Sequence, residues 1–114
     1  MKIGQVFFTT TTLAAILAFS GCASTAETMQ QKGYGPSYSK GYGDGCESGK
    51  KAGGGMFNDF RKNVDRYDRD YKYREGWEDG YRECKGEEKA LMRSIENSQR
   101  ASMERRAIEN SRRY

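Results

Sequence analysis

The residues best suited to chemistry in this 114-residue chain are its three cysteines, Cys22, Cys46 and Cys84. The chain contains no histidine and no Cys-x-x-Cys pair, so it offers neither a typical zinc site nor a thioredoxin-type redox motif. A thiol can otherwise accept a lipid, form a structural disulfide or exchange electrons with another thiol pair. We therefore expect no metal and no cofactor, and we expect these three roles to account for the cysteines.

Acid–base catalysis would rest on carboxylates or lysines in a chain without histidine. Asp44 and Asp79 are the best candidates, because each precedes a glycine in a similar local sequence. Helix capping or a salt bridge, to Lys50 and Lys85 respectively, explains these aspartates without catalysis. The sequence also lacks a phosphate-binding loop, a nucleophile elbow and a calcium loop. We predict that the protein is not an enzyme.

Residues 1–21 have the composition of a secretory signal, in which one positive charge precedes an apolar, threonine-rich stretch. That stretch is short and polar for a spanning helix, which needs about 20 apolar residues. It ends in Phe19, Ser20, Gly21 and Cys22, an order that resembles the lipobox of bacterial lipoprotein signal peptides. The resemblance implies that the signal peptidase recognises the first three and cleaves before Cys22. It also implies that this cysteine receives a diacylglycerol thioether and an N-acyl chain. An ordinary secretory signal, cleaved elsewhere, is the alternative.

Two or three acyl chains, at roughly 0.8 kcal/mol per buried methylene, would hold such a protein on a membrane. Ala23 and Ser24 follow the anchor instead of Asp, which in lipoproteins points to the periplasmic face of the outer membrane. In that oxidising compartment we expect Cys46 and Cys84 to form a structural disulfide. A thiol–disulfide sensor or carrier that uses the same two cysteines is the alternative function.

Residues 38–50 ("YSKGYGDGCESGK") and 73–85 ("YREGWEDGYRECK") form an internal repeat with an offset of 35 residues. Each copy carries a row of small residues beside a row of large ones, both at i, i+4 spacing, so that both rows lie along one helix face. The small rows are Gly41, Gly45, Gly49 and Gly53 in the first copy, and Gly76, Gly80 and Cys84 in the second. The large rows are Tyr38, Tyr42 and Cys46, and Tyr73, Trp77 and Tyr81.

These rows predict an all-α fold, a small antiparallel helical hairpin over residues 37–90 that is stapled by the disulfide. The large row of each helix would lie in the small groove of the other, and Gly-x-x-x-Gly spacing would let the backbones approach closely. If the two cysteines face each other, pseudo-twofold symmetry places Tyr81 over Gly49, and the antiparallel register places Trp77 over Gly53. A disulfide that closes a loop of this length contributes about 4 kcal/mol and helps to offset the helical glycines.

Three further segments flank or connect the repeat. Residues 22–36 are polar and are expected to form a flexible, lipidated tether. Residues 56–73 carry apolar residues at helical spacing and predict a short connecting helix that closes one end of the hairpin. Residues 91–114 lack glycine and proline and predict a basic helix that extends the second hairpin helix. The basic residues expected to contact a partner are Arg105, Arg106, Arg112 and Arg113.

These features predict a small, non-enzymatic lipoprotein of the bacterial envelope that serves as a membrane-anchored structural or interaction module. Its expected partners are the membrane, through the lipid anchor, and either an envelope protein or the cell wall. Cell-wall binding would use the charge of the C-terminal helix. Nucleic acid is not an expected partner, because an envelope lipoprotein rarely meets it. A disordered chain, typical of glycine-rich and charged sequences, is the structural alternative.

Overall fold

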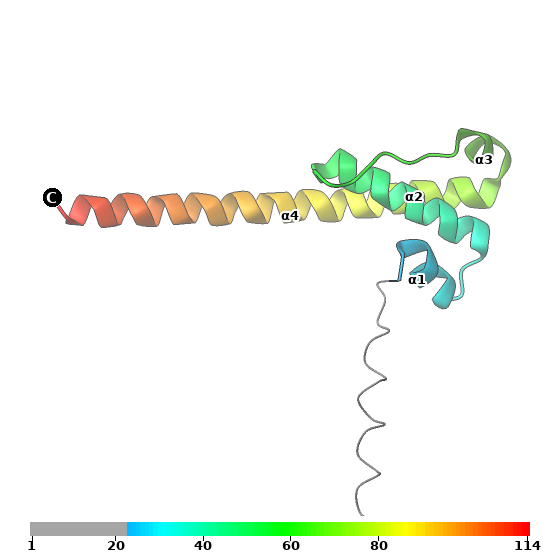
Figure 1. Cartoon of the computed structure of the whole chain (residues 1–114), viewed down its shortest axis with the longest axis horizontal. Coiled ribbons are helices and arrows are strands. Elements are labelled where there is room, and N and C mark those ends of the chain that lie inside the picture. The colour runs from blue at the N-terminus through cyan, green and yellow to red at the C-terminus, as the bar shows by residue number, and fades with distance from the viewer. Residues whose placement is uncertain (1–22) are drawn as a thin grey trace, which may run out of the picture.

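The computed structural model describes residues 23–114, and within them the chain is helical with no strand. Two long helices, α2 and α4, lie side by side and carry the two repeat copies (Figure 1). The Cys46–Cys84 disulfide joins them across 38 positions of sequence. The predicted all-α class and the disulfide-stapled helix pair are therefore confirmed. The four helices of residues 23–114 are α1 (Thr25–Gln31), α2 (Pro36–Gly53), α3 (Val64–Arg69) and α4 (Tyr71–Arg112).

The two long helices run parallel, and the predicted antiparallel direction is wrong. Gly41 lies against Tyr73 and Gly49 lies against Tyr81, so residue numbers increase in the same direction along α2 and α4. Figure 1 shows the chain leaving the end of α2, returning along the pair and entering α4 at the end where α2 began. The predicted contact of Trp77 with Gly53 fails for this reason: Gly53 instead faces Lys85 and Glu88.

The helix pair nevertheless has the predicted twofold relation between repeat copies. Gly41 lies on the backbone carbonyl of Tyr73, and Gly76 lies on that of Tyr38, which is the same contact with the copies exchanged. Each glycine Cα–H points at a carbonyl oxygen, as in weak Cα–H···O bonds. The other matched contacts are Gly45 on Trp77 with Gly80 on Tyr42, and Gly49 on Tyr81 with Cys84 on Cys46.

The segment before α2 is ordered, which corrects the flexible tether predicted for residues 22–36. Ser24 and Glu27 form a reciprocal capping box that starts α1. Gly33 ends the helix in the left-handed region at φ 94°. Met29 is buried, and Ala26 packs on α2 opposite Gly43, where an added Cβ would lie 3.3 Å from the Ala26 Cβ. A capped helix docked through these contacts is not a free tether.

The connection between α2 and α4 also differs from the predicted helix over residues 56–73. Gly54 ends α2 with φ 114°, and the following residues up to Asn63 form no helix. Only α3 is helical, with Asn63 as its N-cap. Four of the apolar residues expected to close the hairpin remain largely exposed. Their exposed fractions are 80% for Met56, 97% for Phe57, 63% for Phe60 and 62% for Val64.

The C-terminal helix continues α4 without a break, as predicted. Asp70 caps its start by accepting a hydrogen bond from the Tyr73 backbone amide at 3.1 Å. Contact with the end of α2 extends as far as Met92, whose side chain lies beside Gly54. Each of residues 93–114 is exposed, so the last five or so turns, about 30 Å of helix, project alone (Figure 1).

The close backbone contact predicts opposite effects for two glycine substitutions. A Cβ on Gly45 would overlap the backbone of Trp77, whereas a Cβ on Gly86 would meet nothing within 4 Å. We expect Gly45→Ala to lower the free energy of unfolding by about 1–3 kcal/mol through overpacking. Gly86→Ala should raise it by about 0.5–1 kcal/mol, because alanine loses less entropy in a helix. Chemical denaturation followed by circular dichroism measures both, and equal effects at the two positions would contradict the backbone contact.

Candidate functional site

A buried tyrosine–aspartate pair joins α4 to α2 beside the segment that returns between them. Tyr73 is fully buried, and its hydroxyl donates to Asp44 Oδ2 at 2.7 Å. The same hydroxyl accepts a hydrogen bond from the Asn63 amide at 3.0 Å. Lys40 Nζ lies 2.6 Å from the other carboxylate oxygen of Asp44, one turn away on α2. The carboxylate is thus neutralised from its own helix and held by the opposite one.

The repeat produces a second copy of this pair. Tyr38 donates its hydroxyl proton to Asp79 Oδ2 at 2.9 Å, which is the Tyr73–Asp44 bond with the copies exchanged. The two aspartates therefore recur because each accepts a phenol proton from the other helix. The expected salt bridges to Lys50 and Lys85 do not form. The observed ionic partners are Lys40 for Asp44 and Arg82 for Asp79.

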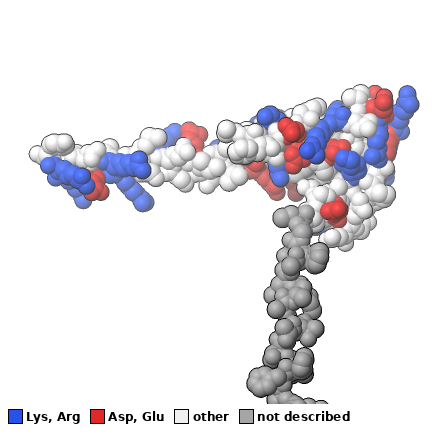
Figure 2. Space-filling view, in the orientation of Figure 1, with Lys and Arg blue, Asp and Glu red and all other residues white. Residues whose placement is uncertain are grey.

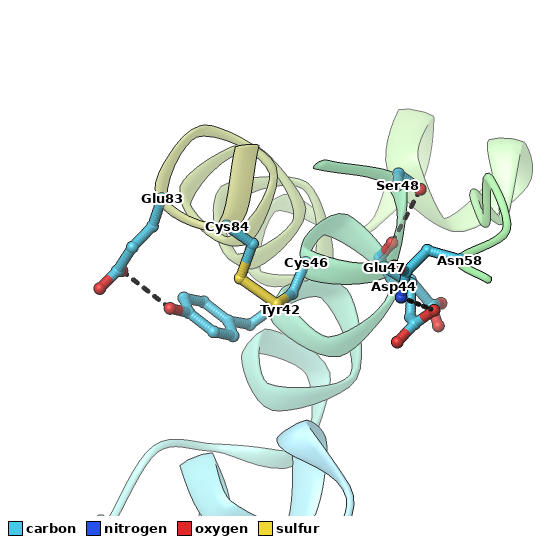
Figure 3. Close-up of a disulfide and its surroundings, with 8 residues drawn as sticks. All are labelled: Tyr42, Asp44, Cys46, Glu47, Ser48, Asn58, Glu83 and Cys84. Carbon is cyan, nitrogen blue, oxygen red and sulfur yellow. Dashed lines mark hydrogen bonds between the residues drawn. A yellow bond between two sulfur atoms is a disulfide. The ribbon is translucent and has the colours of Figure 1, made fainter. Parts of the chain in front are cut away.

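One helical turn further along the pair, the two repeat copies form different hydrogen bonds. Tyr42 donates to Glu83 at 2.7 Å on the open side of the pair (Figure 3). The matching ring, Trp77, instead donates its indole N–H to the backbone carbonyl of Arg61 at 2.7 Å. The Arg61 amide donates to Ser48 Oγ at 2.8 Å, so α2 and α4 hold the same point of the returning segment. The symmetry is broken where the chain must pass back along the pair.

Burial and these acceptors make the phenols harder to ionise. Burial, assisted by the bond to Asp79, raises the pKa of Tyr38 to about 12. Burial is also the main cause for Tyr73, whose pKa rises to about 12 with Asp44 as its acceptor. The pKa of Tyr42 is raised further by burial and by Glu83. These groups are neutral proton donors at physiological pH, and their chemistry is to join the helices.

A lysine held by aromatic rings fastens the returning segment. Lys62 Nζ lies 3.3 Å from the centroid of the Tyr67 ring and 4.5 Å from that of Trp77. Phe60 packs edge-on against Trp77 at 6.0 Å. Cation–π contacts of this kind contribute about 0.5–2 kcal/mol depending on desolvation. Sequence analysis missed this cluster, because the residues are close in space only after the chain has turned back.

The disulfide lies in the same row of contacts between α2 and α4 as the glycines. Cys46 and Cys84 are 3% and 4% exposed, and Figure 3 shows the sulfurs between the two helices, beside Tyr42. Their Cα atoms are 5.0 Å apart, a separation that the neighbouring glycines make possible. The predicted pairing is confirmed, and its symmetry mate is the contact of Gly49 with Tyr81.

The remaining predicted residues lie outside the described chain or on its free helix. Phe19, Ser20, Gly21 and Cys22 precede residue 23, so the proposed anchor is not described. The four predicted contact arginines are exposed at the free end of α4, where Figure 2 shows a cluster of basic side chains. Within residues 23–114, Arg113 pairs with Glu109 at 3.0 Å, and Arg105, Arg106 and Arg112 have no ionic partner.

The described part of the chain lacks both a cluster of metal ligands and a membrane-spanning helix. No group of three or more potential metal ligands occurs in it. No described helix is long and apolar enough to cross a membrane. Comparison of the chain with protein-family models, with curated proteins and with solved structures found no match.

The tyrosine–aspartate pair predicts unequal costs for two matched substitutions. Tyr73→Phe removes a donor from the buried Asp44 and an acceptor from the Asn63 amide, and we expect it to cost about 1–3 kcal/mol of unfolding free energy. Tyr38→Phe deletes the symmetry-related hydroxyl at a more exposed position and should cost less. Denaturant titration of both variants measures the difference. A neutral Tyr73→Phe variant would show that this hydroxyl does not hold the helices together.

The raised phenol pKa values also predict a loss of stability at alkaline pH. A phenol whose folded pKa is about 12 binds its proton more tightly than in the unfolded chain, where the value is 10.0. Its contribution is complete below pH 10 and declines as the pH rises to about 12. The stability difference between the wild type and Tyr73→Phe should therefore narrow over this range. Denaturation at a series of pH values tests it, and a constant difference would contradict the assignment.

Proposed function

We propose that this chain is a non-enzymatic lipoprotein of the bacterial envelope that presents a projecting helix to a protein partner. Its lipid anchor would be Cys22, after cleavage of residues 1–21. The observation that carries the proposal is the free half of α4, in which every residue from 93 on is exposed. A helix that is polar on most faces can bridge solvent between separate packed units, and this one packs on nothing else in residues 23–114.

The packed part of the molecule supports this role by holding α4 rigidly. The glycine contacts that match between the repeat copies, the two tyrosine–aspartate pairs and the disulfide all lie in residues 38–85. The free turns extend beyond them as one continuous helix. The body therefore acts as a base from which the helix projects in a defined direction.

The ordered α1 changes how such an anchor would place the body. Only Ala23 separates Cys22 from Ser24, the N-cap of α1. A lipid on Cys22 would therefore hold the folded base directly at the membrane surface, without a long spacer. On the periplasmic face of the outer membrane, α4 would then extend from a body close to the headgroups.

The burial of both cysteines favours a structural disulfide over a thiol carrier. Exchange requires an attacking thiolate to reach one of the sulfurs, and both residues are nearly inaccessible. The disulfide also has a symmetry-related counterpart, the contact of Gly49 with Tyr81, which holds the helices together without sulfur. We therefore assign Cys46 and Cys84 to the fold and give them no redox role in the proposed function.

The intact mass of the protein from native envelopes tests the anchor and the staple together. Thiols are alkylated in one sample before reduction and in another after it. We expect a chain that begins at a multiply acylated Cys22 and that takes up two alkyl groups only after reduction. Resistance to mild reductant is expected, because closing this loop contributes about 4 kcal/mol and the sulfurs are buried.

A Cys22→Ser variant provides the matched control. It should keep its signal segment, carry no lipid and still form the Cys46–Cys84 bond. An unlipidated wild type would rule out the lipoprotein proposal. Alkylation of Cys46 or Cys84 in unreduced protein would instead support the thiol-exchange alternative.

A further inference from the structure

From Glu87 onward, α4 carries a stripe that is acidic at its start and basic at its end. The stripe follows alternating steps of four and three residues, the spacing of a coiled-coil seam. Acidic Glu87 lies at its start and basic Arg105 at its end. Between them the exposed Leu91 gives way to small side chains. The seam consists of Glu87, Leu91, Ser94, Ser98, Ala101 and Arg105.

We propose that a second copy of this chain docks on this seam, with the two α4 helices antiparallel. In an antiparallel pair of identical helices, the numbers of two facing residues always have the same sum. Glu87 of each copy would therefore face Arg105 of the other. Leu91 would then face Ala101, a large side chain against a small one. At the centre Ser94 would face Ser98, which allows the helices to approach closely.

Self-complementarity is the reason to choose a second copy over another partner. A surface that is acidic at one end and basic at the other satisfies its own charges only when it meets itself in reverse. The same applies to the size gradient from Leu91 to Ala101. A twofold contact of this kind is isologous and closes on a dimer. Figure 2 shows both signs of charge along the same edge of α4, acidic beneath α2 and basic towards the free end.

The rest of the molecule leaves this seam open. The end of α2 contacts α4 through Glu88 and Met92, which lie on a neighbouring face. Leu91 is 52% exposed, and Glu87 and Arg105 are exposed with no ionic partner in the described chain. A shallow groove lies beside the seam; two seam residues, Ser94 and Ser98, line one side of it, and Ile95, Gln99, Ser102, Met103 and Arg106 line the rest. The inference does not depend on the lipid anchor.

A charge exchange tests both the partner and the register. The full chain with its disulfide intact is studied by sedimentation equilibrium in density-matched detergent over a range of concentrations. We expect a reversible monomer–dimer equilibrium. Glu87→Arg alone and Arg105→Glu alone should each raise the dissociation constant about tenfold or more, because each dimer contains the pair twice and attraction becomes repulsion. The double variant Glu87→Arg/Arg105→Glu should return the constant to within about threefold of the wild type.

Arg93→Glu is the matched control, since it makes the same charge change as Arg105→Glu at a position about 120° around the helix from the seam. It should leave the dissociation constant within about threefold of the wild type. Circular dichroism and an intact disulfide verify that each variant is folded. A monomer at all concentrations would overturn the proposal. Association that is equal in all variants, or that the double variant fails to restore, would also overturn it, and neither result bears on lipidation of Cys22.

Discussion

The contact of two helix backbones, made possible by glycine at every fourth position, is the constraint on which the rest of this structure depends. Gly45 and Gly80 let a carbonyl of one helix lie where the other would normally carry a side chain. Helices at this distance leave room for few large groups between them, so aromatic rings lie along the edges of the contact. The disulfide fits the same spacing, since its Cα atoms are 5.0 Å apart. A chain with few aliphatic residues thus obtains a tight interface without a conventional core.

Polar bonds complete this interface and select its register. Tyr73 with Asp44, and Tyr38 with Asp79, bond only when the repeat copies are aligned as they are here. No buried side-chain nitrogen or oxygen in residues 23–114 lacks a partner. A shift of one turn would leave a buried carboxylate without its donor, which costs more than an apolar mismatch of similar size. The polar pairs therefore give specificity, whereas the glycines give proximity.

Several of these features follow from local patterns in the sequence and several do not. The disulfide and the contact of Gly49 with Tyr81 follow from rows at i, i+4 spacing together with a 35-residue repeat. The tyrosine–aspartate pairs had a visible signal as well, because both residue types recur in both copies. The Ser24–Glu27 capping box can also be recognised in the sequence as the start of a helix. The polar composition around it nevertheless suggested a tether. The Lys62 cluster had no such signal, since it joins residues brought together only by the returning chain.

The sequence by itself determined helix content, the rows that meet and the cysteine pairing, because these depend on spacing along one helix. Tertiary structure decided the direction of the pair. A twofold axis can relate two repeat copies as parallel or as antiparallel helices, and Cys46 faces Cys84 in both arrangements. The choice depends on the connection, and 17 residues separate Gly53 from Tyr71. The non-helical residues 54–63 alone reach about 33 Å when extended, which is enough to span the roughly 27 Å of α2. Ser48 and Trp77 hold these residues in that path through the backbone of Arg61, and their bonds form only once the chain has returned.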